Sequence, residues 1–154
     1  MNVVKNVDQF DINNAILCEP IKNNIINDGK FIRIIYSNDV VTFNGIYLLI
    51  ELKHTSCIKH YSKYKCDFNI EDHVDLIHRI KIIETELLNK FNVCNKVAQY
   101  KINEALNTGS VKIHTNINSD DTFYFILKIS GIWETEHKYG LTYKFCKNYD
   151  EIKL

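Results

Sequence analysis

One stripe of apolar residues at helical spacing constrains the fold more than any other feature, because the chain on both sides of it is patterned for strands. Large apolar residues recur along it at steps of four, three, four and four positions: Leu76, Ile80, Ile83, Leu87 and Phe91. Such spacing places them on one face of an α-helix, which Val74, Ile77 and Leu88 widen. The pattern predicts an amphipathic helix of about six turns over residues 70–92, with Asn69 as its N-cap.

Before this helix, runs of β-branched and aromatic residues separated by turn residues predict a strand meander over residues 31–68. Residues 31–36, 40–43 and 46–52 form its first three strands, and residues 53–68 add one or two more. Asn44-Gly45 favours a tight hairpin between the second and third strands, because both residues tolerate positive φ. Residues 1–29, rich in Asn and Asp, predict an irregular N-terminal arm that packs on the core in places.

After the helix, the most aromatic stretch of the chain, residues 122–145, predicts a long β-hairpin. The apolar run over residues 123–129 is typical of a strand buried on both faces, and Ser130-Gly131 interrupts it as a bulge would. Residues 134–140 predict the connecting loop. The strand that follows alternates, which places three side chains on one face: Leu141, Tyr143 and Phe145.

The remaining segments complete a single domain over residues 1–154. Residues 97–106 fit a short helix only ambiguously, residues 111–115 predict a strand and residues 116–121 a polar loop, so the C-terminal strands span residues 111–147. A strand meander, one long helix and further strands define a β-rich α+β class. That order predicts an OB-like five-stranded barrel, with a two-sheet sandwich carrying the helix on one face as the alternative.

Composition limits the partners and the compartment. The chain has 19 basic and 19 acidic residues, and this balance argues against a polyanion binder that depends on bulk charge, although a local basic groove is compatible with it. Five cysteines at irregular spacing, without a secretory signal pattern, predict free thiols in a reducing compartment. We therefore expect a cytoplasmic protein, in a host cytoplasm or a virion, with no membrane partner.

Three small clusters contain residue types that carry chemistry, and in each we favour a structural interpretation. His54, Cys57, His60 and Cys66 offer four zinc ligands, but at offsets that point to opposite faces of a strand. Asp39, Glu51 and Lys53 resemble the core of PD-(D/E)xK nucleases, in which two carboxylates hold Mg²⁺. Glu134, Glu136 and His137 lie in the predicted hairpin loop. We expect no catalytic residue, no bound metal and no cofactor.

Aromatic residues interleaved with lysines are the remaining signal, and they occur in two strand-like runs. Single-stranded nucleic acid is bound by aromatic rings that stack on bases and by cations that contact phosphates, although rings in strands also build cores. The candidate nucleic-acid-binding residues are Tyr61, Tyr64, Lys65, Lys128, Trp133, Lys138, Tyr139, Tyr143 and Lys144.

The phrases Lys128-Ile-Ser-Gly-Ile-Trp-Glu-Thr135 and Tyr139-Gly-Leu-Thr-Tyr-Lys-Phe145 resemble the C-terminal hairpin of small proteins from large cytoplasmic DNA viruses and virus-like linear plasmids. This resemblance implies a single-stranded-DNA-binding or replication accessory factor. We accordingly expect a non-catalytic single-stranded-DNA-binding protein of replication or repair, which forms a homo-oligomer or contacts replication proteins. The alternatives are a metal-dependent nuclease and a viral assembly subunit without a ligand.

Overall fold

The computed structural model describes residues 5–25, 28–114 and 124–147. Its strands are β1 Lys5–Asn6, β2 Ala15–Leu17, β3 Ile21–Lys22, β4 Lys30–Ser37, β5 Thr42–Phe43, β6 Ile46–Glu51, β7 Ser56–His60, β8 Lys63–Asp67, β9 Val97–Gln99, β10 Ser110–Ile113, β11 Tyr124–Glu134 and β12 Lys138–Cys146. Its helices are the 3-10 turns η1 Val7–Gln9, η2 Ile12–Asn14 and η3 Ile70–His73, and the α-helices α1 Val74–Phe91 and α2 Lys101–Asn107.

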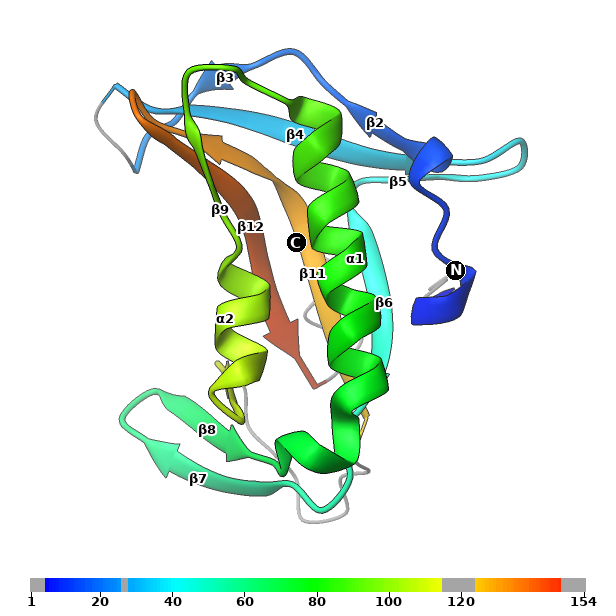
Figure 1. The fold of residues 1–154 in the computed structure, drawn as a ribbon, viewed down its shortest axis with the longest axis vertical. Coiled ribbons are helices and arrows are strands. Elements are labelled where there is room, and N and C mark those ends of the chain that lie inside the picture. Colours follow the sequence, from blue (N-terminus) through cyan, green and yellow to red (C-terminus); the bar gives the residue numbers. More distant parts are fainter. Residues whose placement is uncertain (1–4, 26–27, 115–123, 148–154) are drawn as a thin grey trace.

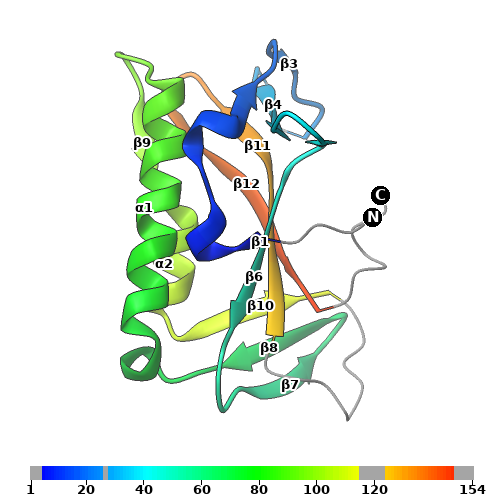
Figure 2. The same ribbon diagram turned by 90° about the vertical axis from the view of Figure 1, so that its right-hand side faces the viewer.

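The strands form a mixed open sheet with the main order β1-β6-β11-β12-β10-β8-β7, and β4 pairs with β11 beside β6 (Figure 1). Both α-helices cover the same face of this sheet (Figure 2). Strands make up 45% of the structure, which confirms a β-rich fold with one long helix. None of the helices in the described residues has the length and apolarity needed to cross a bilayer.

The predicted long helix is confirmed as η3 and α1, 22 residues together. It begins where the Asn69 side chain accepts the Glu71 N–H at 3.1 Å, and it ends at Asn92, whose left-handed φ of 33° closes the last turn. The apolar stripe faces the sheet: Ile80, Ile83 and Leu87 are buried, and Leu76 and Phe91 pack against the same core. The prediction that Val74 widens this stripe is wrong: Val74 lies about 120° around the helix from Ile80 and is 59% exposed.

The β11–β12 hairpin forms the centre of the sheet. Its predicted bulge is confirmed between Ile129 and Gly131, where β11 also changes partner: it pairs with β6 before the bulge and with β4 after it. The predicted loop is shorter than expected, because β12 already includes Tyr139 and Gly140. Gly140 lies directly opposite Trp133, and a Cβ at this glycine would come within 2.8 Å of the Trp133 ring, so the ring takes the place of a side chain there.

The hairpin predicted at Asn44-Gly45 does not form. Here β5 pairs back on β4, while β6 pairs with β11 over six residues and with β1. Gly45 has φ of 122° and forms the corner at which the chain leaves β5 for the sheet centre. The long-range pairing prevails because it buries Ile46, Leu48 and Ile50 of β6, whereas β5 has only two strand residues to offer.

The N-terminal arm is held by side chains of α1. Asp8 in η1 forms an ion pair with Arg79, and Lys90 Nζ donates to the Ile12 carbonyl at 3.1 Å. The arm is not wholly irregular, because β1 pairs with β6 in parallel and β2 pairs with β4. The predicted strand at residues 111–115 is confirmed as β10, and residues 97–107 form β9 and α2. The polar loop predicted at residues 116–121 lies outside the described residues.

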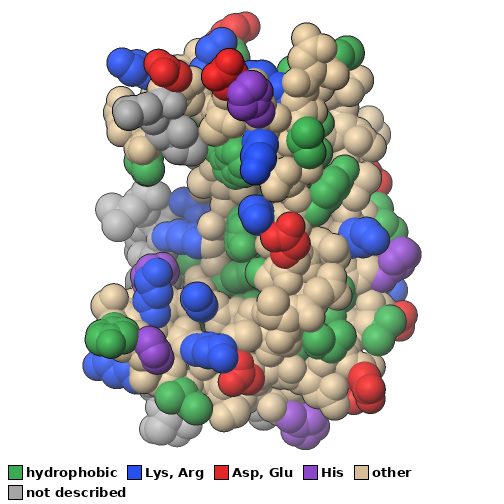
Figure 3. Space-filling model, turned by 60° about the vertical axis from the view of Figure 1, so that its left-hand side comes forward, with side chains coloured by type: hydrophobic (Ala, Val, Ile, Leu, Met, Phe, Trp, Pro, Cys, Tyr) green, Lys and Arg blue, Asp and Glu red, His purple; other side chains and the backbone are tan. Residues whose placement is uncertain are grey.

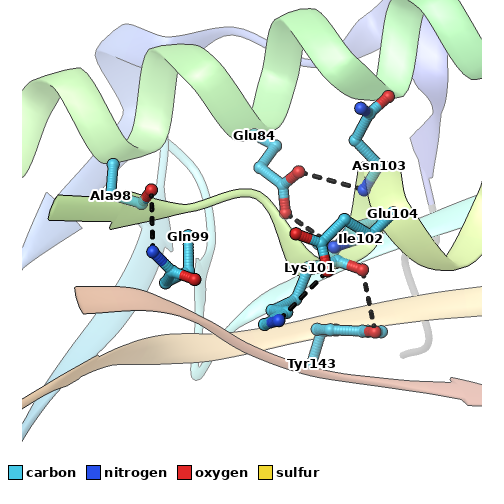
Figure 4. A network of polar contacts seen from close by, with 8 residues as sticks. All are labelled: Glu84, Ala98, Gln99, Lys101, Ile102, Asn103, Glu104 and Tyr143. Carbon is cyan, nitrogen blue, oxygen red and sulfur yellow. Dashed lines mark hydrogen bonds and ion pairs between the residues drawn. The ribbon is translucent and has the colours of Figure 1, made fainter. Parts of the chain in front are cut away.

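The short helix α2 is capped by a side chain of α1. Glu84 is fully buried, and its two carboxylate oxygens accept the backbone N–H groups of Ile102 at 2.9 Å and Asn103 at 3.0 Å (Figure 4). These N–H groups lie in the first turn of α2, where no intrahelical acceptor exists. Burial raises the pKa of Glu84 above its ordinary value, and the two backbone hydrogen bonds act in the opposite direction.

The expectation of free thiols needs correction for one pair of cysteines. Cys57 on β7 and Cys66 on β8 lie directly opposite each other, with Cα atoms 4.1 Å apart, and form a disulfide. Cys18, Cys94 and Cys146 are not disulfide-bonded. The pairing could not follow from spacing along the chain, because the strand register brings the two sulfur atoms together.

Candidate nucleic-acid interface

Four lysines on four consecutive strands form a row on the sheet face opposite the α-helices. We call these residues the lysine row: Lys65 on β8, Lys112 on β10, Lys144 on β12 and Lys128 on β11. Strand register pairs the first two lysines with each other and the last two with each other. Lys112 and Lys144 are neighbours because the residues that follow them, Ile113 and Phe145, form the one register pair between the parallel strands β10 and β12.

The lysine row points away from the helices because side chains alternate along each strand. The residues beside the lysines in sequence face the hydrophobic core: Cys66, Val111, Ile113, Phe145, Leu127 and Ile129. Neighbouring strands lie about 4.8 Å apart, so the row spans about 14 Å. It therefore places four lysines in a line across the sheet of a chain that carries no net charge, and three of them, Lys65, Lys112 and Lys144, are exposed.

Charge is crowded at the β11 end of the row. Lys128 is only 8% exposed, and its Nζ lies 5.6 Å from the centre of the Tyr47 ring. Burial lowers the pKa of Lys128, and the nearby positive charges of Lys144 and Arg33 lower it further.

Two hollows in the surface meet at Lys63, Lys65 and Lys112. The first, of about 460 Å³, lies at the tip of the β7–β8 hairpin beside His60 and Tyr61. The second, of about 550 Å³, extends along β10 to His114, Tyr143 and Lys144 and is bordered by the end of α2. It opens because β10 and β12 share a single register pair and diverge away from it.

Lysine and histidine side chains gather at this part of the surface, over the β7–β8 end of the molecule (Figure 3). Tyr61 stands out there, because it occupies the hairpin turn with φ of 57° and its side chain is 89% exposed. The His60 ring meets it edge to face, with ring centres 4.8 Å apart. This pair provides an accessible aromatic surface beside the lysine row.

The structure brings together some of the predicted residues and separates others. Tyr61, Lys65, Lys128 and Lys144 belong to the row or its hollows, and Tyr143 reaches the second hollow from the helix side of the sheet, where its hydroxyl donates to the Lys101 carbonyl at 3.2 Å. Tyr64 lies on the opposite face of β8 from Lys65 and packs against the core.

Three predicted residues lie at the other end of the β11–β12 hairpin, away from the row. Tyr139 is 7% exposed, and its ring centre lies 5.4 Å from that of Phe91 in the core. Trp133 is half-buried over Gly140, and Lys138 is exposed at the hairpin turn. Since a stacking platform needs a free ring face, we leave Tyr139 out of the interface.

Sequence reasoning missed four residues of this surface: His60, Lys63, Lys112 and His114. Two short alternations in the sequence indicate strands with a basic outer face, because a core residue separates the two basic residues in each. They are Lys63-x-Lys65 and Lys112-x-His114. Their alignment into one surface depends on the β8–β10 register, which pairs Lys65 with Lys112. That register joins segments separated by the whole of α1.

The clusters considered for other chemistry are not assembled in the described residues. The candidate zinc ligands Cys57 and Cys66 are bonded to each other, and no group of three or more potential metal ligands occurs among the residues described. Asp39 lies in the β4–β5 turn, whereas Glu51 lies at the far end of β6 (Figure 1). Glu134 forms an ion pair with Lys96, whereas the exposed Glu136 and His137 lie 3.8 Å from each other at the hairpin turn.

Comparison of the chain with protein-family models, with curated protein sequences and with solved structures found no match. The resemblance of residues 128–145 to viral and plasmid proteins therefore stays a prediction. The class of site, an extended basic surface with an exposed aromatic pair, is defined by the residues of this chain alone.

Proposed function

We propose that this protein binds single-stranded DNA along the lysine row and its two hollows, without catalysing a reaction. The observation that carries the proposal is the lysine row itself, four lysines aligned across four neighbouring strands, three of them exposed. Phosphodiester chains are lines of regularly spaced negative charge, and cations that follow them supply most of the affinity of such complexes.

The exposed end of the row favours an anionic ligand. Lys65 and Lys112 lie directly opposite each other on paired strands, where like charges are destabilising, and Asp67, 3.8 Å from Lys65 Nζ, offsets part of that repulsion. Phosphates bound over these two lysines would reduce the repulsion further.

The aromatic pair at the hairpin tip favours a single strand over a duplex. Unpaired bases stack on exposed rings, and each such contact is worth about 1–3 kcal/mol, whereas duplex bases are already stacked on each other. Tyr61 and His60 border the first hollow, next to the lysines that would contact phosphates. A base stacked on Tyr61 would leave its own phosphate close to Lys63 and Lys65.

Finer features of the proposal are supported by the order of elements and by the resemblance. An OB-type barrel would curve the sheet around a bound strand, as in other proteins that bind single strands on such folds. We further propose a role in DNA replication or repair in the cytoplasm, within a homo-oligomer or together with replication proteins. Each of these extends the DNA-binding proposal and is open to a separate test.

The proposal is tested by fluorescence anisotropy with labelled oligo-dT at two salt concentrations. Lys112→Ala should weaken binding and lower the slope of log affinity against log salt by about 0.7, the value for one lost phosphate contact on a single strand. Lys81→Ala is the matched control, because Lys81 is an exposed lysine of α1 on the other side of the sheet. Failure to bind oligo-dT at low salt, or a preference for duplex, would overturn the proposal.

A further inference from the structure

The β7–β8 hairpin is attached to the sheet through one of its two strands. β8 pairs with β10 through four register pairs, whereas β7 lies at the sheet edge and, within the described part of the chain, pairs with β8 alone. The residues of β7 are exposed except for Cys57, which is half-buried and packs against the core. An edge strand with so little buried surface depends on few contacts for its position.

The Cys57–Cys66 disulfide supplies the firmest of those contacts. Cys66 has no exposed surface and belongs to the core cluster. The disulfide therefore links the edge strand covalently to the buried side of β8, at a pair of residues directly opposed in the hairpin. The other described cysteines, Cys18, Cys94 and Cys146, are not disulfide-bonded.

The same hairpin carries the aromatic end of the proposed interface. His60 ends β7, Tyr61 and Ser62 form the turn, and Lys63 and Lys65 point outward from β8 into the shared hollow. We propose that the Cys57–Cys66 disulfide is a redox-controlled staple of this interface: closed, it holds the hairpin tip in place for single-stranded DNA, and opened, it releases β7 and weakens binding. This inference rests on the proposed function.

The chemistry of opening is a thiol–disulfide exchange with a small dithiol as reductant. A thiolate of the dithiol attacks the half-buried sulfur of Cys57, the S–S bond breaks, and Cys66 leaves as a thiolate that takes up a proton. The second thiol of the reductant then attacks the reductant's other sulfur atom, which is bonded to Cys57 in the mixed disulfide, and Cys57 is released as a thiol. Two electrons and two protons pass to the protein, and the reductant becomes a cyclic disulfide.

Closure reverses these steps with a small-molecule disulfide as oxidant. Disulfides in reducing compartments are mostly transient and redox-sensing, so a single disulfide in a chain expected to be cytoplasmic is a suitable place for such control. Opening removes the covalent link but leaves Lys65, Lys112, Lys128 and Lys144 on their strands. We therefore expect binding to weaken rather than vanish, with most of the loss arising from the aromatic tip.

The experiment compares the full chain with its disulfide closed and after reduction by dithiothreitol, with alkylation and mass measurement to establish the state of Cys57 and Cys66. Hydrogen exchange over residues 56–67 reports on the hairpin, and anisotropy reports on oligo-dT affinity. Reduction should speed hydrogen exchange in β7 and weaken oligo-dT binding by about threefold to tenfold. This loss corresponds to part of the binding free energy of one base stacked on an aromatic ring. Cys57→Ser should match the reduced protein in both buffers, whereas Cys94→Ser should respond as the native chain does.

Two results would overturn the inference while leaving DNA binding intact. One is unchanged exchange in β7 although alkylation shows that the disulfide is open. The other is faster exchange with unchanged oligo-dT affinity, which would make the disulfide structural only. If neither redox form binds oligo-dT, the proposed function itself fails and the regulatory role fails with it, and the exchange data alone then show whether the disulfide holds β7.

Discussion

Replacement of the buried carboxylate of Glu84 should cause one of the largest single-residue losses of stability in this protein. Glu84→Ala removes the acceptors of two backbone N–H groups in α2, those of Ile102 and Asn103. Hydrogen bonds to a charged group contribute about 1.5–3 kcal/mol each, and part of this gain is offset because the carboxylate is held out of water. We expect the free energy of unfolding to fall by about 2–4 kcal/mol.

Glu84→Gln separates hydrogen bonding from packing. The amide keeps one oxygen acceptor but turns an NH₂ group toward the second backbone N–H, so one of the two bonds is lost, with a cost of about 1–3 kcal/mol. Glu86→Gln on the same helix is the matched control, because Glu86 is partly exposed and its replacement should change stability by less than about 0.5 kcal/mol. Urea unfolding followed by circular dichroism measures both variants.

The pH dependence has a defined sign. Burial raises the pKa of Glu84 in the folded protein, so the folded state binds this proton more tightly than the unfolded state. The resulting stabilisation is fully present below the unfolded pKa of about 4.3 and is lost as the pH rises through the folded pKa. The penalty of Glu84→Gln should therefore be largest near pH 4 and smaller at pH 7. A penalty that grows with pH would show that the two hydrogen bonds outweigh burial.

Three further predictions concern the core, the bulge and the interface. Leu87→Ala should lower the free energy of unfolding by about 2–5 kcal/mol, because Leu87 is fully buried, and a value below 1 kcal/mol in urea unfolding would contradict its place in the core. Gly131→Ala should reduce the thermal midpoint, since its Cβ would lie 2.6 Å from the Phe31 ring; an unchanged midpoint would argue against this close approach. Tyr61→Ala should weaken oligo-dT binding about tenfold without loss of stability, whereas Tyr139→Ala should mainly destabilise the fold; the reverse pattern in paired binding and unfolding measurements would refute the assignment of these rings.

Local sequence determined the elements whose cause is local. The apolar repeat from Leu76 to Phe91 required a helix with one buried face, and the glycine at position 131 marked the bulge. Alternation along residues 141–145 placed Leu141 and Phe145 in the core. In each case the periodicity of a single segment carries the information, because helix and strand geometry fix which neighbours share a face.

Tertiary structure decided which segments meet. Asn44-Gly45 has the composition of a hairpin turn, yet β6 pairs with β11 because burial of its apolar face in the sheet centre outweighs a short local hairpin. Cys57 and Cys66 are bonded because β7 and β8 bring them into register. The lysine row depends on three strand pairings among four separate segments, and a shift of one residue in any of them would turn a lysine toward the core. The sequence by itself determined that these lysines alternate with core residues; only long-range strand pairing could align them into one surface.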